Sequence, residues 1–298
     1  MITSISDQIK VFNDSNFPYL FGGSKARKIK YILSDAKKNN ANAIVSAGSA
    51  SSNHARDCAL ACAQHGWSCT LIIHDHEDYT KDNLFLMRLC GARLIFCELS
   101  EVSSLMDEAM LEYKHNGLTP YYIWGGGHSV YGSLALKEAV KDFAEQSDNW
   151  IPDFVVVASG TGGTQAGLHV GFEQIYPKTK VIGISIARNK ERGSEAVHNA
   201  INELTSFCNL PPTKNEVEFL DDFVEAGYAA TSKEIDNVIK EYAKKGLLLD
   251  STYTGKAFNG LLKLIEMHKL PRKSNILFWH TGGIFNLLND KNRILENL

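Results

Sequence analysis

The spacing of apolar residues changes repeatedly between two periods along this chain. Short continuous or alternating runs are typical of strands, and apolar residues three or four apart are typical of helices. We expect strands at residues 43–47, 69–73, 93–97, 121–124, 154–158, 181–186 and 276–280. We expect helices at residues 26–38, 53–65, 83–90, 101–115, 132–145, 164–174, 194–207, 233–245 and 255–267. This alternation predicts an α/β protein with mostly parallel sheets.

The strand expected at residues 154–158 reads Phe-Val-Val-Val-Ala and is apolar throughout. Such a run is typical of a central parallel strand that is covered on both faces. The strand–helix units are too many for one ordinary doubly wound sheet, so we expect two domains, each of three αβα layers. The large domain is predicted to comprise residues 1–38 and 140–298, and the small domain residues 39–139.

Charge and hydropathy exclude several classes of partner. The formal net charge is -3 and no block of basic residues stands out, so we expect neither nucleic acid nor a membrane surface as partner. The first residues, Met1-Ile2-Thr3-Ser4, do not resemble a secretory signal, and no apolar run approaches the length of a membrane span. We therefore expect a cytoplasmic protein.

The cysteines and one histidine-rich stretch contain residue types that can bind metals. Cysteines among apolar neighbours are typical of reduced thiols packed in a core, and no second pair completes a zinc pattern with Cys58 and Cys62. The stretch His-Asp-His-Glu-Asp at residues 74–78 follows an apolar strand and is interpreted as a solvated loop. No metal site is predicted.

Four regions are richer in glycine and polar residues than a connector needs. They are residues 22–28, 48–54, 160–164, and residues 250–256 together with 280–283. In parallel α/β sheets the ligand binds at the carboxyl ends of the strands. All four regions are expected at or near that edge, so they indicate one shared site.

The third region favours phosphate binding over a plain tight turn. Its glycines let backbone N–H groups converge, and the helix that follows offers its positive end. The lysine of a Walker A loop is missing, and Gln165 stands where a dinucleotide loop has its third glycine. The residues predicted to bind phosphate are Gly160, Thr161, Gly162, Gly163 and Thr164.

Lys25 has an unusual context for a lysine. Gly22 and Gly23 precede it, a helix begins after it, and Arg27 and Lys28 add positive charge nearby. The helix end and the neighbouring charges disfavour the ammonium form, so we expect the pKa of Lys25 to lie below its usual value of about 10.4. A lysine that attacks an aldehyde must be neutral, which makes Lys25 a candidate nucleophile.

The segment Ser52-Asn53-His54 also stands at the start of a helix. Ser52 or Asn53 could simply cap that helix. Alternatively, both could present donors to a carboxylate and to a cofactor ring. The sequence pattern leaves these two interpretations open.

Taken together, these motifs resemble the family of pyridoxal 5'-phosphate (PLP) enzymes that contains 1-aminocyclopropane-1-carboxylate (ACC) deaminase and D-cysteine desulfhydrase. The resemblance lies in the segments at residues 22–28, 52–54, 160–167, 253–256 and 280–283, which occur in the family's order. It implies the PLP fold type II, as in the tryptophan synthase β-subunit, and PLP as cofactor. A small amino acid is the implied substrate and a homodimer the expected assembly.

The resemblance also implies a role for each matching residue. Lys25 would hold PLP as a Schiff base and later exchange the Cα proton, with Ser52 and Tyr253 as further catalytic residues. Asn53 would bond the phenolic oxygen of the cofactor, and residues 160–164 would bind its phosphate. Thr254 and Thr281 would also contact the cofactor. The substrate pocket would be lined by Ser52, Asn53, His54, Tyr228 and Tyr253.

Three positions separate the two branches of this family. The cyclopropane-opening deaminases resemble a pattern with Glu, Leu and Gln where this chain has Thr254, Thr281 and His54. A carboxylate near the pyridine nitrogen deepens the electron sink, whereas a neutral hydroxyl suits elimination of a good leaving group. We therefore expect a lyase resembling D-cysteine desulfhydrase, releasing pyruvate, ammonia and the β leaving group. An ACC-type deaminase and a PLP or amino-acid-binding protein without turnover are the alternatives.

One loop departs from the family pattern. The chain has Gly126-Gly127-His128-Ser129 where two glycines, Ser and Asn are usual. The departure falls in a loop that is expected to face the substrate side of the site.

Overall fold

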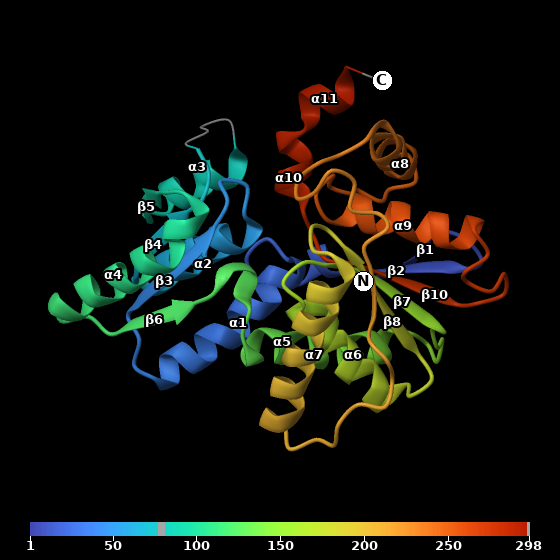
Figure 1. The fold of residues 1–298 in the computed structure, drawn as a ribbon, viewed down its shortest axis with the longest axis horizontal. Coiled ribbons are helices and arrows are strands. Elements are labelled where there is room, and N and C mark those ends of the chain that lie inside the picture. The colour runs from blue at the N-terminus through green and yellow to red at the C-terminus, as the bar shows by residue number, and fades with distance from the viewer. Residues whose placement is uncertain (77–80, 297–298) are drawn as a thin grey trace.

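The alternation of strands and helices builds two separate sheets in the computed structural model, which describes residues 1–76 and 81–296 (Figure 1). The smaller sheet has four strands in the order β5-β4-β3-β6, and the larger has six in the order β1-β2-β10-β7-β8-β9. Only β1 and β2 pair antiparallel, while every other pair of neighbouring strands is parallel. The predicted α/β class with mostly parallel sheets is confirmed.

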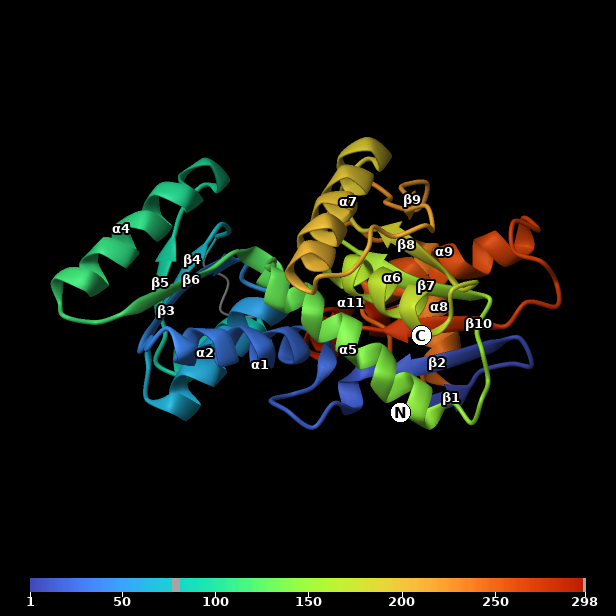
Figure 2. The same ribbon diagram turned by 90° about the horizontal axis from the view of Figure 1, so that it is seen from below.

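The small unit is formed by one continuous part of the chain. Its strands are β3 (Ala43–Gly48), β4 (Ser68–Ile73), β5 (Arg93–Phe96) and β6 (Pro120–Ile123). Its helices are α2 (Asn53–His65), α3 (Asp82–Leu89) and α4 (Val102–His115). Apolar side chains of α2 and α3 pack in one cluster and those of α4 in another. Figure 2 shows α2 and α4 on opposite faces of this sheet.

The large unit combines both ends of the chain. Its strands are β1 (Ile2–Ser4), β2 (Ile9–Asn13), β7 (Phe154–Ser159), β8 (Lys180–Ser185), β9 (Glu218–Leu220) and β10 (Ile276–His280). Its helices are α5 (Val130–Gln146), α6 (Gly163–Ile175), α7 (Lys190–Phe207), α8 (Lys233–Ala243), α9 (Thr254–Glu266), α10 (Ile284–Asn289) and α11 (Lys291–Leu295). On β7, Val155 and Val157 pack with α5 and α6, while Val156 packs with α8 and α9. This strand is therefore covered on both faces, as its sequence predicts.

Helix α1 (Gly23–Lys38) lies between the two units, in contact with α2 of the small unit and α5 of the large one (Figure 1). Helix α5 runs through residues 139 and 140, where the sequence predicts a domain boundary. The boundaries at residues 38/39 and 139/140 remain a prediction.

A buried ion pair fixes the entry to α1. The Asp14 carboxylate accepts from Arg27 Nε at 2.6 Å and from Trp279 Nε1 at 2.8 Å, and both charged side chains are buried. Removing one partner of such a pair costs about 3–5 kcal/mol, because the other charge stays buried without compensation. These contacts hold the first turn of α1, which carries Lys25, against the end of β10.

Two further predictions concern membrane spans and the polar loop at residues 74–78. Within residues 1–76 and 81–296, no helix combines the length and apolar character needed to cross a membrane. The loop predicted at residues 74–78 is described as far as His76, and Glu77 and Asp78 lie outside the described residues.

Candidate active site

The ends of β10 and the first turn of α1 meet at the carboxyl edge of the large sheet. Ser24 N donates to Thr281 O at 3.0 Å, which ties the residue before Lys25 to the segment after β10. A small hollow here is lined by Lys25, Asn53 and Thr281, together with Arg56. The structure therefore brings three predicted site residues, from three of the four glycine-rich regions, to one place.

Lys25 faces an aromatic residue in a poorly solvated position. Its Nζ lies 5.9 Å from the ring centroid of Tyr253 and donates a long hydrogen bond, 3.5 Å, to Ser24 Oγ. Burial lowers the pKa of Lys25, and the nearby carboxylates of Asp57 and Asp250 oppose that effect. The neutral amine, which is the nucleophilic form, therefore makes up a larger fraction at a given pH than in a lysine exposed to water.

Tyr253 and Tyr228 form a pair at the mouth of the site. Their hydroxyl oxygens are 2.6 Å apart, and Tyr228 is 44% exposed, so the pair joins the interior to solvent. Burial, followed by the neighbouring Tyr228, raises the pKa of Tyr253 well above its usual value. The Tyr253 hydroxyl therefore remains protonated at neutral pH and can donate a hydrogen bond.

Asn53 is held by a polar network that spans both units. Its Oδ1 accepts from Arg56 Nη1 at 2.9 Å and from Asn83 Nδ2 at 3.2 Å. Asn83, on α3, also donates to Asn286 Oδ1 on α10 at 3.0 Å. Within residues 1–76 and 81–296 the Asn53 side-chain N–H groups make no hydrogen bond, so they can donate to a ligand in the hollow that Asn53 lines.

Ser52 caps α2, which was one of the two interpretations left open by its sequence. Its Oγ accepts from Ala55 N at 3.1 Å. The cap uses the oxygen as an acceptor, so the hydroxyl hydrogen can still be donated to a substrate carboxylate. The predicted substrate contact of Ser52 remains a prediction that is compatible with the cap.

His54 lies beneath the turn at residues 125–127. Its side chain is buried, and Nε2 lies 2.9 Å from Ser46 Oγ. Burial, followed by Lys25 and Lys28, lowers the pKa of His54 to about 3. The ring is therefore neutral at physiological pH. Its predicted contact with substrate remains a prediction.

The buried His54 predicts a pH dependence of stability. The unfolded chain protonates this histidine near pH 6.5, whereas the folded chain does so only near pH 3, so proton binding favours unfolding between these values. We expect His54 to reduce the free energy of unfolding by roughly 2 kcal/mol at pH 5 relative to pH 7. Urea unfolding of the wild type and of His54→Asn at both pH values measures this: the variant should show the shallower pH dependence.

Replacing the exposed His198 by asparagine provides the matched control, which should keep the wild-type dependence. An unchanged pH dependence in His54→Asn would show that the loss of stability comes from other groups.

The loop at residues 160–164 leads into α6 as its sequence predicts. Gly162 has a φ of +92° and precedes the helix, which begins at Gly163. The first intrahelical bond is donated by Ala166 N to Gly162 O, so the preceding N–H groups of the first turn point out of the helix end. A Cβ on Gly162 would meet the α7 backbone at 3.1 Å, which explains why this position must be glycine.

The sequence does not assign Lys28 to phosphate binding, but the structure places its amine beside the start of α6. Its Nζ lies 3.5 Å from the point that a Cβ on Gly163 would occupy, and it donates to Gly126 O at 3.3 Å. The side chain is 1% exposed, and burial, followed by Lys25, lowers the pKa of Lys28 well below its usual value. An amine buried beside a helix N-terminus is a donor suited to an anion.

These observations test whether the residues fit PLP. An anion cradle at α6 is made by Lys28 and the first-turn N–H groups, and a nucleophilic amine is supplied separately by Lys25. The free amide of Asn53 adds a donor between the two units. The residues fit a group that carries both a phosphate and a reactive carbonyl.

A buried carboxylate, Asp250, lies beside Thr254. Its oxygens accept from the backbone N–H groups of Thr252, Tyr253 and Thr254 at 2.9 to 3.1 Å and from the Thr254 hydroxyl at 2.7 Å. Asp250 is therefore occupied in shaping the loop that carries Tyr253. The Thr254 hydroxyl, in turn, has its hydrogen committed to Asp250.

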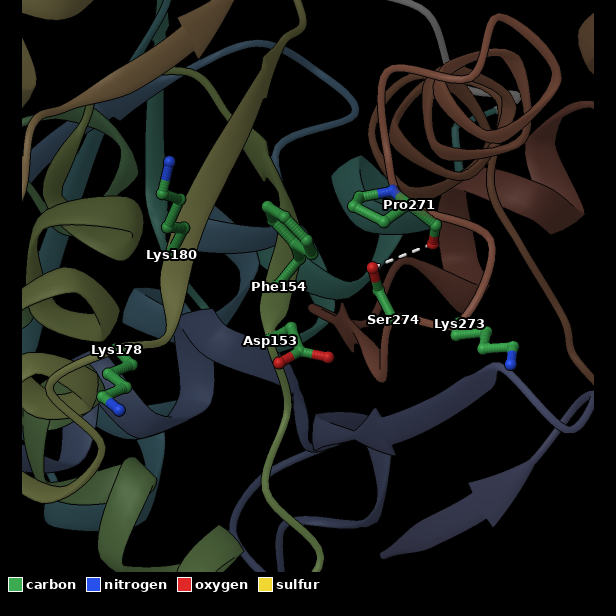
Figure 3. Close-up of a pocket in the computed structure, with 7 residues that line it drawn as sticks. All are labelled: Asp153, Phe154, Lys178, Lys180, Pro271, Lys273 and Ser274. Atoms are coloured by element: carbon green, nitrogen blue, oxygen red, sulfur yellow. Dashed lines mark hydrogen bonds between the residues drawn. The ribbon is translucent and has the colours of Figure 1, made fainter.

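A second hollow, of about 430 Å³, lies at the opposite edge of the large sheet (Figure 3). It is lined by the starts of β7 and β8, and the side chains of Lys178, Lys180 and Lys273 point away from one another. Asp153 Oδ2 accepts from Asn275 N at 2.8 Å, so its carboxylate supports the backbone. The polar groups of this hollow do not converge on one point.

Comparison with known proteins agrees with this geometry. The family described as "Pyridoxal-phosphate dependent enzyme" matches residues 13–282. A protein of Yersinia enterocolitica named D-cysteine desulfhydrase is 32% identical over 285 residues, which cover 93% of this chain and 86% of that protein.

Two solved structures resemble this chain, one at 30% and one at 14% sequence identity. The crystal structure of an ACC deaminase homologue matches with a TM-score of 0.89 and 30% identity, over 97% of this chain and 89% of the other. An L-serine ammonia-lyase from the fungus Rhizomucor miehei matches with a TM-score of 0.71 over 97% of this chain and 92% of the other. At 14% identity, this second match shows the fold alone.

Proposed function

The chain belongs to the family of pyridoxal-phosphate-dependent enzymes, and within that family we propose that it eliminates a β leaving group from a small amino acid. The predicted family, the α/β fold and the PLP cofactor are confirmed by the match over residues 13–282. The substrate we propose is D-cysteine or a β-substituted alanine. The products would be pyruvate, ammonia and the leaving group, which is sulfide in the case of D-cysteine.

The observation that carries this proposal is the bonding of Asp250. Its oxygens are occupied by three backbone N–H groups and the Thr254 hydroxyl, so Thr254 and Thr281 present neutral groups on this side of the site. Without a free carboxylate, little negative charge can be drawn toward the pyridine nitrogen. Departure of a thiolate needs less charge storage than opening of a cyclopropane ring. The 32% identity to the Yersinia desulfhydrase supports the same branch.

We propose the following roles for the residues of this chain. Bound PLP supplies an electron sink for the pair of electrons released at Cα. Lys25 Nζ takes the proton from Cα, because its lowered pKa makes the neutral amine available. The protonated Tyr253 hydroxyl donates toward the departing group, and its bond to Tyr228 holds it in place. Ser52 and Asn53 orient the substrate carboxylate and the cofactor ring.

Turnover of a panel of amino acids tests this proposal. We expect equal amounts of pyruvate and ammonia from D-cysteine or a β-substituted alanine, with sulfide in the first case, and little ammonia from ACC. The elimination needs one water for each imine hydrolysed and no oxidant, so anaerobic and aerobic rates should agree.

Two other results would replace the proposal. Efficient ammonia release from ACC, with none from any β-substituted alanine, would assign the chain to the deaminases. ACC is included in the panel because the chain is 30% identical to the ACC deaminase homologue. Binding of PLP and amino acids without any product would indicate a binding protein.

We further propose that the protein is a cytoplasmic homodimer. All six cysteines are unpaired, which suits a reducing compartment. Exposed apolar side chains occur on α3 (Phe85 and Leu89) and on α10 (Leu288), and these two helices contact each other. Such a patch suits an interface between two copies. Sedimentation equilibrium tests the dimer, and a monomer at micromolar concentration would refute it.

A further inference from the structure

His128 occupies a position where the chain departs from its family pattern, and the structure directs this side chain toward the cofactor site. The turn Gly125–Gly127 reverses the chain, with φ of +70° at Gly126 and +66° at Gly127. Trp124 and His128 form an antiparallel bridge across the turn. Gly126 also approaches the phosphate loop closely, since a Cβ there would lie 3.3 Å from Thr161 Cγ2. The imidazole is thereby fixed beside α6.

Three polar side chains converge on the first residue of α6. The point that a Cβ on Gly163 would occupy lies 3.2 Å from Ser133 Oγ, 3.5 Å from Lys28 Nζ and 3.8 Å from His128 Nδ1. The N–H groups of the first turn of α6, which precede its first intrahelical bond, lie at the same helix end. His128 therefore stands in the cradle that Lys28 and the glycine loop form.

The Nδ1 atom of His128 is buried and, among the described residues, has no hydrogen-bond partner. A buried polar atom without a partner is costly, so the site is incomplete as the protein chain alone builds it. Burial, followed by Lys28, lowers the pKa of His128, so that one ring nitrogen carries hydrogen and can be a donor. Lys28 and the helix end disfavour a cation here and favour an oxyanion.

We propose that His128 binds the phosphate of PLP through Nδ1–H, beside Lys28 and the N–H groups of residues 162–164. His128 also lines a hollow of about 340 Å³, together with Trp124, Thr161 and Arg188. The proposal rests on the cofactor and not on the proposed elimination reaction. It can therefore fail while the reaction stands, and it can hold whichever substrate is turned over.

The test compares PLP with pyridoxal, which has the same ring and aldehyde but no phosphate. The holoenzyme is dialysed against graded concentrations of either compound, and the bound fraction is read from near-violet absorbance. In His128→Ala we expect the dissociation constant for PLP to rise about tenfold or more, because a bond to a charged acceptor is lost. The dissociation constant for pyridoxal should stay within about twofold of the wild type.

Two further variants keep the test decisive. His128→Ser carries the residue that the family pattern has here and replaces the alanine variant if that one does not fold. The exposed His198→Ala on α7 is the matched control and should bind both compounds like the wild type. Equal losses for PLP and pyridoxal would make His128 a structural residue only. Unchanged affinity for PLP in both His128 variants would also overturn the proposal.

Discussion

The variant Lys25→Ala should lose turnover by roughly 10³-fold or more and should lose the near-violet absorbance of lysine-bound PLP. Lys25 is the lysine that faces Tyr253, at 5.9 Å from its ring centroid, and it lines the same hollow as Asn53 and Thr281. Lys28 faces the phosphate cradle instead. PLP should still bind to the variant without a covalent bond, because the cradle is intact, and phosphate analysis of the dialysed protein measures this retention.

Lys30→Ala, at an exposed position on the same helix, is the control and should keep both absorbance and turnover. A full absorbance band in Lys25→Ala would move the covalent attachment to another lysine. Lys28 would be the first to examine, since it lies one helical turn further along α1.

The variant Lys28→Met should weaken PLP binding and stabilise the protein freed of cofactor. The side chain of Lys28 is buried, and among the described residues its Nζ donates to Gly126 O at 3.3 Å. Losing a donor to the phosphate should raise the dissociation constant for PLP by about 10- to 100-fold. Methionine fills similar space without a buried polar group, so the free energy of unfolding without PLP should rise by about 1–3 kcal/mol. Absorbance titration and urea unfolding measure the two effects.

The opposite signs of these two effects make the prediction specific. A substitution that merely damages packing would lower both PLP affinity and stability. Lys37→Met, exposed near the end of α1, controls for the change in net charge and should alter neither.

The central elements of the fold could be predicted from the sequence because each one is long or strongly patterned. Helix α2 and strand β10 begin and end at the predicted residues, and β7 differs from its prediction by one residue. The strands β1, β2 and β9 were missed. Strands β1 and β9 have three residues each, too few to show a period, and β2 depends on pairing with β10, which is distant in sequence.

The candidate site could be predicted where a motif is contiguous. Lys25, Asn53 and the loop at residues 160–164 stand in such motifs, and the structure brings them to one edge. Lys28 and Asp250 lie inside motifs, but the sequence does not indicate these roles. Lys28 contacts Gly126 and the start of α6, which are distant in sequence. Asp250 accepts from backbone N–H groups, whose direction only the folded loop shows. Asn83, which donates to Asn53, and Asn286, which accepts from Asn83, belong to none of these motifs.

The pairing of β2 with β10 has a consequence for synthesis of the protein. The small sheet uses residues 43–123 only, so it can form on the ribosome before β10 is translated. The large sheet needs residues 9–13 beside residues 276–280, so β2 waits for a partner strand that is made more than 200 residues later. Lys25 is held against Thr281 by that same late pairing. The nascent chain therefore cannot assemble the lysine pocket until residues 276–281 have left the ribosome, and cofactor loading follows the synthesis of β10.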